Sequence, residues 1–176
     1  MSKKSMRFIS LLCAAGALLS ATASVAQTLW QNTNVGMTAD QIRRAQPSAQ
    51  VPSRAQTLHG GAVCGLELPD YEVGSDHFRV CFFMKDGRLA QVTMTSTEPS
   101  IPAYDALSVM LRARYGNELS ASSQPCARGR GLTVCTMEWL LDTGVNVSLL
   151  YSDVNGRLQI LNVVYQTRLR DARDRL

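Results

Sequence analysis

Much of the chain alternates apolar and polar residues with a period of two, which is the pattern of half-buried β-strands. The first such region covers residues 54–97 and contains the segment FRVCFFMKDGRLAQVTM. Within it, Asp86 and Gly87 separate two β-prone runs. This dipeptide favours a type I′ hairpin turn, whose two central residues both need positive φ. We therefore expect an antiparallel hairpin in which Cys81 lies opposite Val92.

Strand patterns return after residue 130, in the segments GLTVCTMEWLL, VNVSLLYSD and GRLQILNVVYQT. The last two segments flank Asn155-Gly156, a second candidate for a type I′ turn. We expect these three segments to form further antiparallel strands.

Two segments have the signature of a helix. In GMTADQIRRAQP, Thr38 and Gln41 form a capping box, and Pro47 ends the helix because the residue before proline avoids the α region. In PSIPAYDALSVMLRARYG, Ser100 is the N-cap and Gly116 the C-terminal cap. Helical spacing gives the second helix one apolar face, which comprises Tyr104, Leu107, Met110 and Leu111.

The two halves of the chain look alike. FRVCFFMKDGRL and VNVSLLYSDVNGRL share an alternating strand, a turn ending in glycine, and an Arg-Leu pair directly after that glycine. One helix precedes these strands in each half. The sequence therefore predicts an α+β fold of two tandem repeats, about 30–98 and about 99–167, in a single domain. Its helices pack on one face of an antiparallel sheet, and a charged tail of residues 168–176 follows.

Residues 1–26 have the order of a secretory signal peptide: basic residues, an apolar run from Phe8 to Leu19, then small residues. The run is shorter than the ~20 residues of a membrane-spanning helix. We expect cleavage after Ala26, with Ala23 as the alternative. The residue before Cys13 is not small, so no lipid anchor is expected. The sequence thus predicts a periplasmic or secreted protein without a membrane span.

Charge argues against nucleic acid as a partner. The chain has 18 basic and 14 acidic residues, and removal of residues 1–26 takes three basic residues and leaves 15 against 14. Nucleic-acid binding needs a concentrated basic surface, which this balance does not provide.

Beyond Cys13 the chain has four cysteines, and an even number in an oxidising compartment favours disulfides. Of the three possible pairings we expect the two local ones, Cys64 with Cys81 and Cys126 with Cys135. The alternative is a zinc site, because the spacing H-x4-C-x12-H-x3-C formed by His59, Cys64, His77 and Cys81 is close to that of a zinc finger. We expect no metal and no cofactor.

Several of these motifs resemble exported envelope proteins: VGMTADQIRRAQPSA at the first helix, YG at the end of the second, and two glycine-turn hairpins with GRL. The chain is similar in them to the SmpA/OmlA-type lipoprotein of the outer-membrane β-barrel assembly machinery and to β-lactamase inhibitory proteins. The resemblance covers most of residues 30–166. It implies helices on one face of an antiparallel sheet, a disulfide in each half, and a protein-binding role without catalysis.

The candidate binding residues lie on loops and strands. Arg128 and Arg130 lie on a glycine-rich loop between two cysteines, where they can address a carboxylate or phosphate or simply be solvated. Tyr71 and Trp139 are aromatic anchor candidates, with the core as the alternative position of Trp139. An acidic segment is a calcium candidate or a solvated connection; it comprises Glu67, Asp70, Glu72 and Asp76.

These features predict a non-catalytic, exported module of the cell envelope that binds a protein partner. The alternative is a periplasmic or secreted inhibitor of a hydrolase, such as a β-lactamase or a cell-wall enzyme. A third possibility, an enzyme, requires a deep polar pocket with perturbed titratable groups. Neither the identity of the partner nor the oligomeric state follows from the sequence.

Overall fold

The computed structural model describes residues 27–122, 126, 131–156 and 158–167. Its elements in chain order are β1 (Thr28–Trp30), β2 (Thr33–Asn34), α1 (Ala39–Ala45), β3 (Val63–Val73), β4 (Asp76–Lys85), β5 (Arg88–Ser96), α2 (Ile101–Tyr115), β6 (Ser120–Ser122), β7 (Leu132–Leu140), β8 (Val145–Val154) and β9 (Leu158–Thr167). The predicted signal peptide and the charged tail lie outside the described residues.

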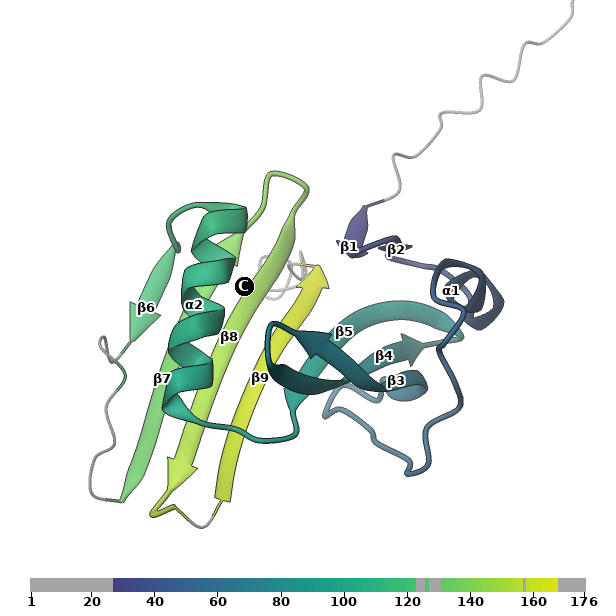
Figure 1. The fold of residues 1–176 in the computed structure, drawn as a ribbon. Coiled ribbons are helices and arrows are strands. Elements are labelled where there is room, and N and C mark those ends of the chain that lie inside the picture. The colour runs from purple at the N-terminus through teal and green to yellow at the C-terminus, as the bar shows by residue number, and fades with distance from the viewer. Residues whose placement is uncertain (1–26, 123–125, 127–130, 157, 168–176) are drawn as a thin grey trace, which may run out of the picture.

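Seven strands form one antiparallel sheet in the order β3-β4-β5-β9-β8-β7-β6, and β1 pairs with β2 separately. The sheet contains two three-stranded meanders, β3-β4-β5 and β7-β8-β9, each made of strands that are consecutive along the chain. They meet where β5 pairs with β9, so that Val92 lies opposite Tyr165. Figure 1 shows α2 in front of β7 and β8, while β3, β4 and β5 lie to the right of β9.

Both helices begin at the predicted caps. Thr38 accepts a hydrogen bond from the backbone N–H of Gln41, whose side-chain oxygen accepts one from the backbone N–H of Thr38 at 2.8 Å. The Ser100 hydroxyl accepts a hydrogen bond from the Ala103 N–H at 3.2 Å, and Gly116 ends α2 with a φ of 80°. These local signals therefore fix where the helices start and stop.

The predicted α+β class, with helices packed along one face in two equal repeats, is wrong, because the chain is mainly β. Helix α1 does not form a second cover: it has 7 residues, with Ile42 as its buried residue, whereas α2 has 15 residues. The proline at position 47 stops α1 after two turns, and a helix that short contributes one apolar contact rather than a layer. One helix alone lies along the seven-stranded sheet among the described residues.

The main core lies between α2 and the sheet. Tyr104 of α2 and Tyr151 of β8 are both fully buried, with their ring centroids 6.3 Å apart. Alternate residues of the central strands point into this core, among them Val92, Val147 and Val163. The side of the sheet that carries these residues is called here the helix-side face.

The opposite side is called here the open face, and it is defined on β5, β9, β8 and β7. Because strand residues alternate between faces, the register assigns the open face its residues. They are Gln91, Thr93, Thr95, Leu158, Ile160, Asn162, Val164, Gln166, Asn146, Ser148, Leu150, Ser152, Val154, Leu132, Val134, Thr136, Glu138 and Leu140. All except Thr93 are half-buried or exposed.

The first hairpin differs from its predicted register by one residue. Asp86 and Gly87 both have positive φ, as a type I′ turn requires, and Lys85 lies opposite Arg88. A bulge between Phe83 and Met84 then shifts the ladder, so that Cys81 lies opposite Thr93 instead of Val92. The shift places Cys81 on the same side of the sheet as the open face, away from the main core.

Candidate functional site

The open face has an exposed apolar end. The register aligns Leu132, Val154 and Leu158 in one row across β7, β8 and β9. Their exposed fractions are 64%, 40% and 57% respectively. The next row adds Val134 and Ile160. These five residues are called here the aliphatic end. A contiguous exposed patch of large apolar side chains on a folded protein marks an interaction surface.

The remainder of the open face is largely uncharged, with Leu140, Leu150 and Val164 among polar side chains. Its middle rows carry amides and hydroxyls, including Asn162, Gln166, Ser148 and Thr95. On its four strands, Glu138 is the charged residue that the register places on this face. An apolar end bordered by neutral hydrogen-bonding groups suits a surface that loses water without leaving a buried charge unpaired.

The corresponding face of the first meander is covered. Residues 46–62 run along β3, where Gln50 and Thr57 form isolated bridges with Glu67 and Val63. Beneath this segment lies a second, small apolar cluster of Ala62, Cys64, Cys81 and Phe83, against which Leu58 packs. On this side of the sheet, the part that the described residues leave uncovered therefore lies on β5, β9, β8 and β7.

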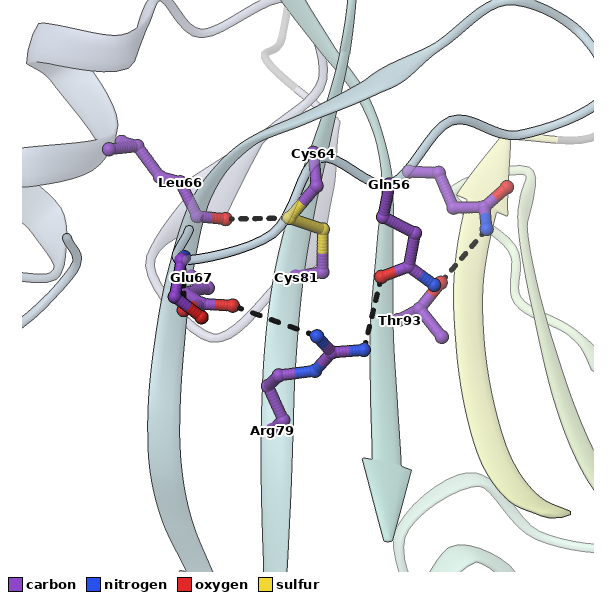
Figure 2. The surroundings of a disulfide bond; sticks show 9 residues. Gln56, Cys64, Leu66, Glu67, Arg79, Cys81 and Thr93 are labelled. Atoms are coloured by element: carbon purple, nitrogen blue, oxygen red, sulfur yellow. Dashed lines mark hydrogen bonds and ion pairs between the residues drawn. A yellow bond between two sulfur atoms is a disulfide. The ribbon is translucent and has the colours of Figure 1, made fainter. Parts of the chain in front are cut away.

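The disulfide between Cys64 and Cys81 is part of this small cluster, with the two Cα atoms 5.8 Å apart (Figure 2). It joins β3 to β4, and it is one of the two pairs expected from the sequence. Arg79 lies beside it, bonded to Gln56 at 3.2 Å and 3.9 Å from the buried carboxylate of Glu67. The disulfide and these polar contacts hold residues 46–62 against the sheet.

The second disulfide joins Cys126 to Cys135, with Cα atoms 5.7 Å apart. It is the other expected pair. Both cysteines are buried in the main core, and Cys135 lies opposite Tyr151 on the helix-side face. The two disulfides therefore lie on opposite sides of the sheet. The second one anchors the start of β7, where Leu132 and Val134 of the aliphatic end are found.

A pocket of about 470 Å³ opens on the helix side, between α2, β1 and β3. Its buried floor comes from Trp30, Met94, Leu107, Leu111, Val163 and Tyr165. The floor lies over β5 and β9, at the junction of the two meanders. Since α2 lies over β8 and α1 is too short to form a second layer, this part of the sheet keeps an opening.

The rim of the pocket is polar and aromatic, and it comprises Gln31, Tyr71, Met110, Arg114 and Tyr115. The Gln31 amide donates to the Tyr71 hydroxyl, and the Arg114 guanidinium lies 5.5 Å from the centre of the Tyr115 ring. Burial raises the pKa of Tyr165, and the neighbouring Tyr115 raises it further. The Tyr165 hydroxyl therefore remains protonated at neutral pH.

The predicted binding residues have separate positions. Tyr71 lies on β3 at the rim of the pocket, with its ring edge-on to Trp30 at 5.2 Å between centroids. Trp139 is a core residue: it is buried, and its indole N–H donates to the Gly116 carbonyl at 3.0 Å. Arg128 and Arg130 lie outside the described residues. Neither the aliphatic end nor the pocket was found from the sequence.

The zinc hypothesis conflicts with the disulfide, because Cys64 and Cys81 are bonded to each other and offer no thiolate. Of the acidic segment, Asp70 and Glu72 come within 4.8 Å of His77, and all three are exposed. The hydrogen bond to Asp70, and then its charge, raise the pKa of His77. Glu67 lies apart from them, buried beside Arg79. This cluster is explained as an exposed ion pair.

Within the described ranges, no helix is long and apolar enough to cross a membrane. A scan against family models and searches of curated proteins and solved structures found no match to this chain.

Proposed function

We propose that this protein is a non-catalytic binding module of the cell envelope that recognises a protein partner through its open face. The observation that carries the proposal is the aliphatic end, where Leu132, Val154 and Leu158 are exposed side by side on a sheet face that no described helix covers.

The size of the face supports a protein partner rather than a small molecule. Four strands spaced by ~4.8 Å, each about nine residues long at ~3.3 Å per residue, present roughly 600 Å² in projection. A stable protein interface buries about 800 Å² on each partner. Side chains roughen the face and increase its accessible area beyond the projection, so the two values are comparable.

The composition of the face supports the same conclusion. Interfaces have an apolar centre and a rim of neutral polar groups, and they are depleted of charge at the centre. Here the apolar part includes the five residues of the aliphatic end, with Leu150 and Val164 in the rows beyond it. Asn162, Ser148 and Gln166 supply hydrogen-bonding groups. Removal of water from these groups costs little when the partner offers matching donors and acceptors.

Three further arguments support the proposed compartment. The two disulfides are compatible with an oxidising location outside the cytoplasm. The signal-peptide pattern of residues 1–26 and the resemblance to SmpA/OmlA-type and β-lactamase inhibitory proteins support the periplasm or secretion.

A direct binding measurement tests the proposal. A partner is isolated on the immobilised protein, purified, and titrated calorimetrically against the wild type and against a Leu132→Asp, Leu158→Asp double variant. Burial of two unpaired carboxylates in an apolar interface should weaken binding by roughly a hundredfold or more. The control is Leu119→Asp, because Leu119 is 67% exposed and lies outside the open face.

Equal affinities of the double variant and Leu119→Asp would contradict the proposal, provided that circular dichroism shows both to be folded. Inhibition of a hydrolase is the alternative function. A panel of β-lactamases and cell-wall hydrolases, assayed with and without the purified protein, distinguishes an inhibitor from a partner-binding module without inhibitory activity.

A further inference from the structure

The pocket beneath α2 is a second site, separate from the open face. Met94, Val163 and Tyr165 of its floor belong to the helix-side face, so the sheet itself separates the pocket from the aliphatic end. A ligand in the pocket and a protein on the open face would not compete for the same residues.

The dimensions of the pocket fit a small molecule. Its volume of about 470 Å³ is within the ~300–1,000 Å³ of small-molecule sites, which are mostly apolar with a few polar groups that orient the ligand. The floor is made of aromatic, aliphatic and methionine side chains, and methionine adapts to ligands of irregular shape. The ligand therefore needs an apolar body.

The charge of the pocket lining indicates which polar group the ligand carries at the end opposite to its apolar body. Arg114 is the residue with a formal charge among those that line the pocket, and it is exposed at the rim. The guanidinium fork matches a carboxylate with two parallel hydrogen bonds. The Gln31 amide is on the same rim. One positive charge at the mouth of an apolar cavity is complementary to a single negative charge.

We propose that the pocket binds a monocarboxylate with an apolar body of about ten carbon atoms, whose carboxylate pairs with Arg114 while the body lies on the floor between Trp30 and Val163.

Calorimetry with decanoate, and with decanol as its neutral counterpart, tests this on the purified protein. Decanoate should bind at least about tenfold more tightly than decanol, because only the anion pairs with the guanidinium. Arg114→Gln should reduce the affinity for decanoate to that for decanol and leave decanol binding unchanged.

A matched pair of α2 variants tests the location. Ala113 lines the pocket and is exposed, so Ala113→Trp should block decanoate without disturbing the core. Val109 is 64% exposed on the same helix and does not line the pocket, so Val109→Trp should bind decanoate like the wild type. The Leu132→Asp, Leu158→Asp variant should also retain decanoate binding.

Three results would overturn the inference. The first is no binding of decanoate by the wild type. The second is equal affinity for decanoate and decanol, which would make the pocket an apolar cavity without selection for an anion. The third is an Ala113→Trp variant that binds as tightly as Val109→Trp. None of these results bears on partner binding at the open face, so the two proposals fail separately.

Discussion

The two meanders of the sheet have the same three-stranded topology but different covers: the first is buried on both sides, with Phe78, Val80 and Phe82 in the main core. In β3-β4-β5 the segment of residues 46–62 and the disulfide Cys64–Cys81 cover the side of the open face. In β7-β8-β9 the cover is α2, and the disulfide Cys126–Cys135 is on the same side as the helix. Similar strands and turns therefore do not imply similar surroundings.

This difference determines where each candidate site lies. Because none of the described residues covers the open face of the second meander, Leu132 and Leu158 remain exposed there. Because α1 is too short to continue the layer begun by α2, the pocket remains open over β5 and β9. Both sites are parts of the sheet that α2 leaves uncovered.

The largest expected effect is in the main core. Leu149 on β8 is fully buried in the main core, and Leu149→Ala should lower the free energy of unfolding by about 2–5 kcal/mol, through lost burial and the cavity left behind. Leu58→Ala in the small cluster should lower the free energy of unfolding by less, because Leu58 is only partly buried. Urea denaturation measures the unfolding free energy of both variants. Equal losses would mean that the small cluster contributes as much to stability as the main core.

Removal of the disulfides sharpens the comparison. Loop closure over 17 and 9 residues predicts losses of about 3 kcal/mol for Cys64→Ala with Cys81→Ala and about 2.5 kcal/mol for Cys126→Ala with Cys135→Ala. Thermal denaturation measures these losses. The second variant should also weaken partner binding, since it frees the start of β7. If the first variant weakened it more, the assignment of binding to the second meander would be wrong.

Gly65 tests the close contact between β3 and β4. A Cβ atom at this position would lie 2.6 Å from Cγ of Met84, so Gly65→Ala should destabilise the protein by roughly 1–3 kcal/mol. Gly60 is the matched control, because a Cβ atom there meets nothing within 4 Å. Gly60→Ala should change the unfolding free energy by less than about 0.5 kcal/mol. Similar values for both variants would show that Met84 yields easily.

The smallest expected effect on stability comes from a comparison of one ion pair on each helix. Arg112 and Glu118 form a two-bonded ion pair at the end of α2, with distances of 2.8 and 2.6 Å, and this hydrogen bonding lowers the pKa of Glu118 from 4.5 to about 2. The contribution of the pair is complete above about pH 4.5 and is lost as the pH falls to about 2. We expect the pair to stabilise the folded protein by on the order of 1 kcal/mol.

Glu118→Gln should therefore reduce stability at pH 7 and flatten its dependence on pH between about 4.5 and 2. The exposed pair of Arg43 and Asp40 on α1 is the control, and Asp40→Asn should change the unfolding free energy by less than about 0.5 kcal/mol. Denaturation curves at pH 7, 4 and 2.5 give the comparison. An unchanged pH dependence in Glu118→Gln would contradict the role of the ion pair.

Short-range features were predictable from the sequence because neighbouring residues determine them. The capping box at Thr38, the cap at Ser100 and the turn at Asp86-Gly87 are each set by a few adjacent side chains. The two disulfides were predictable for a similar reason, since each joins cysteines that are near each other in the chain, with sequence separations of 17 and 9 residues.

Features that depend on distant segments were not predictable. The run FRVCFF has apolar residues at both even and odd positions. The pattern therefore could not show which residues face the main core, or that a bulge shifts the partner of Cys81. Leu132 and Val134 have the sequence pattern of ordinary strand residues, and their exposure depends on how the segments around β7 pack after folding. Segments on both sides of the pocket, from Trp30 to Tyr165, meet only after folding.

Site-specific photo-crosslinking in cells that express the protein tests the central claim most directly, with p-benzoylphenylalanine placed at one position at a time. A probe at Leu158 or Val154 on the open face should crosslink to one protein partner, while a probe at Leu119, which is more exposed than either but lies outside that face, should not. Crosslinks from Leu119 with none from Leu158 and Val154 would contradict the account.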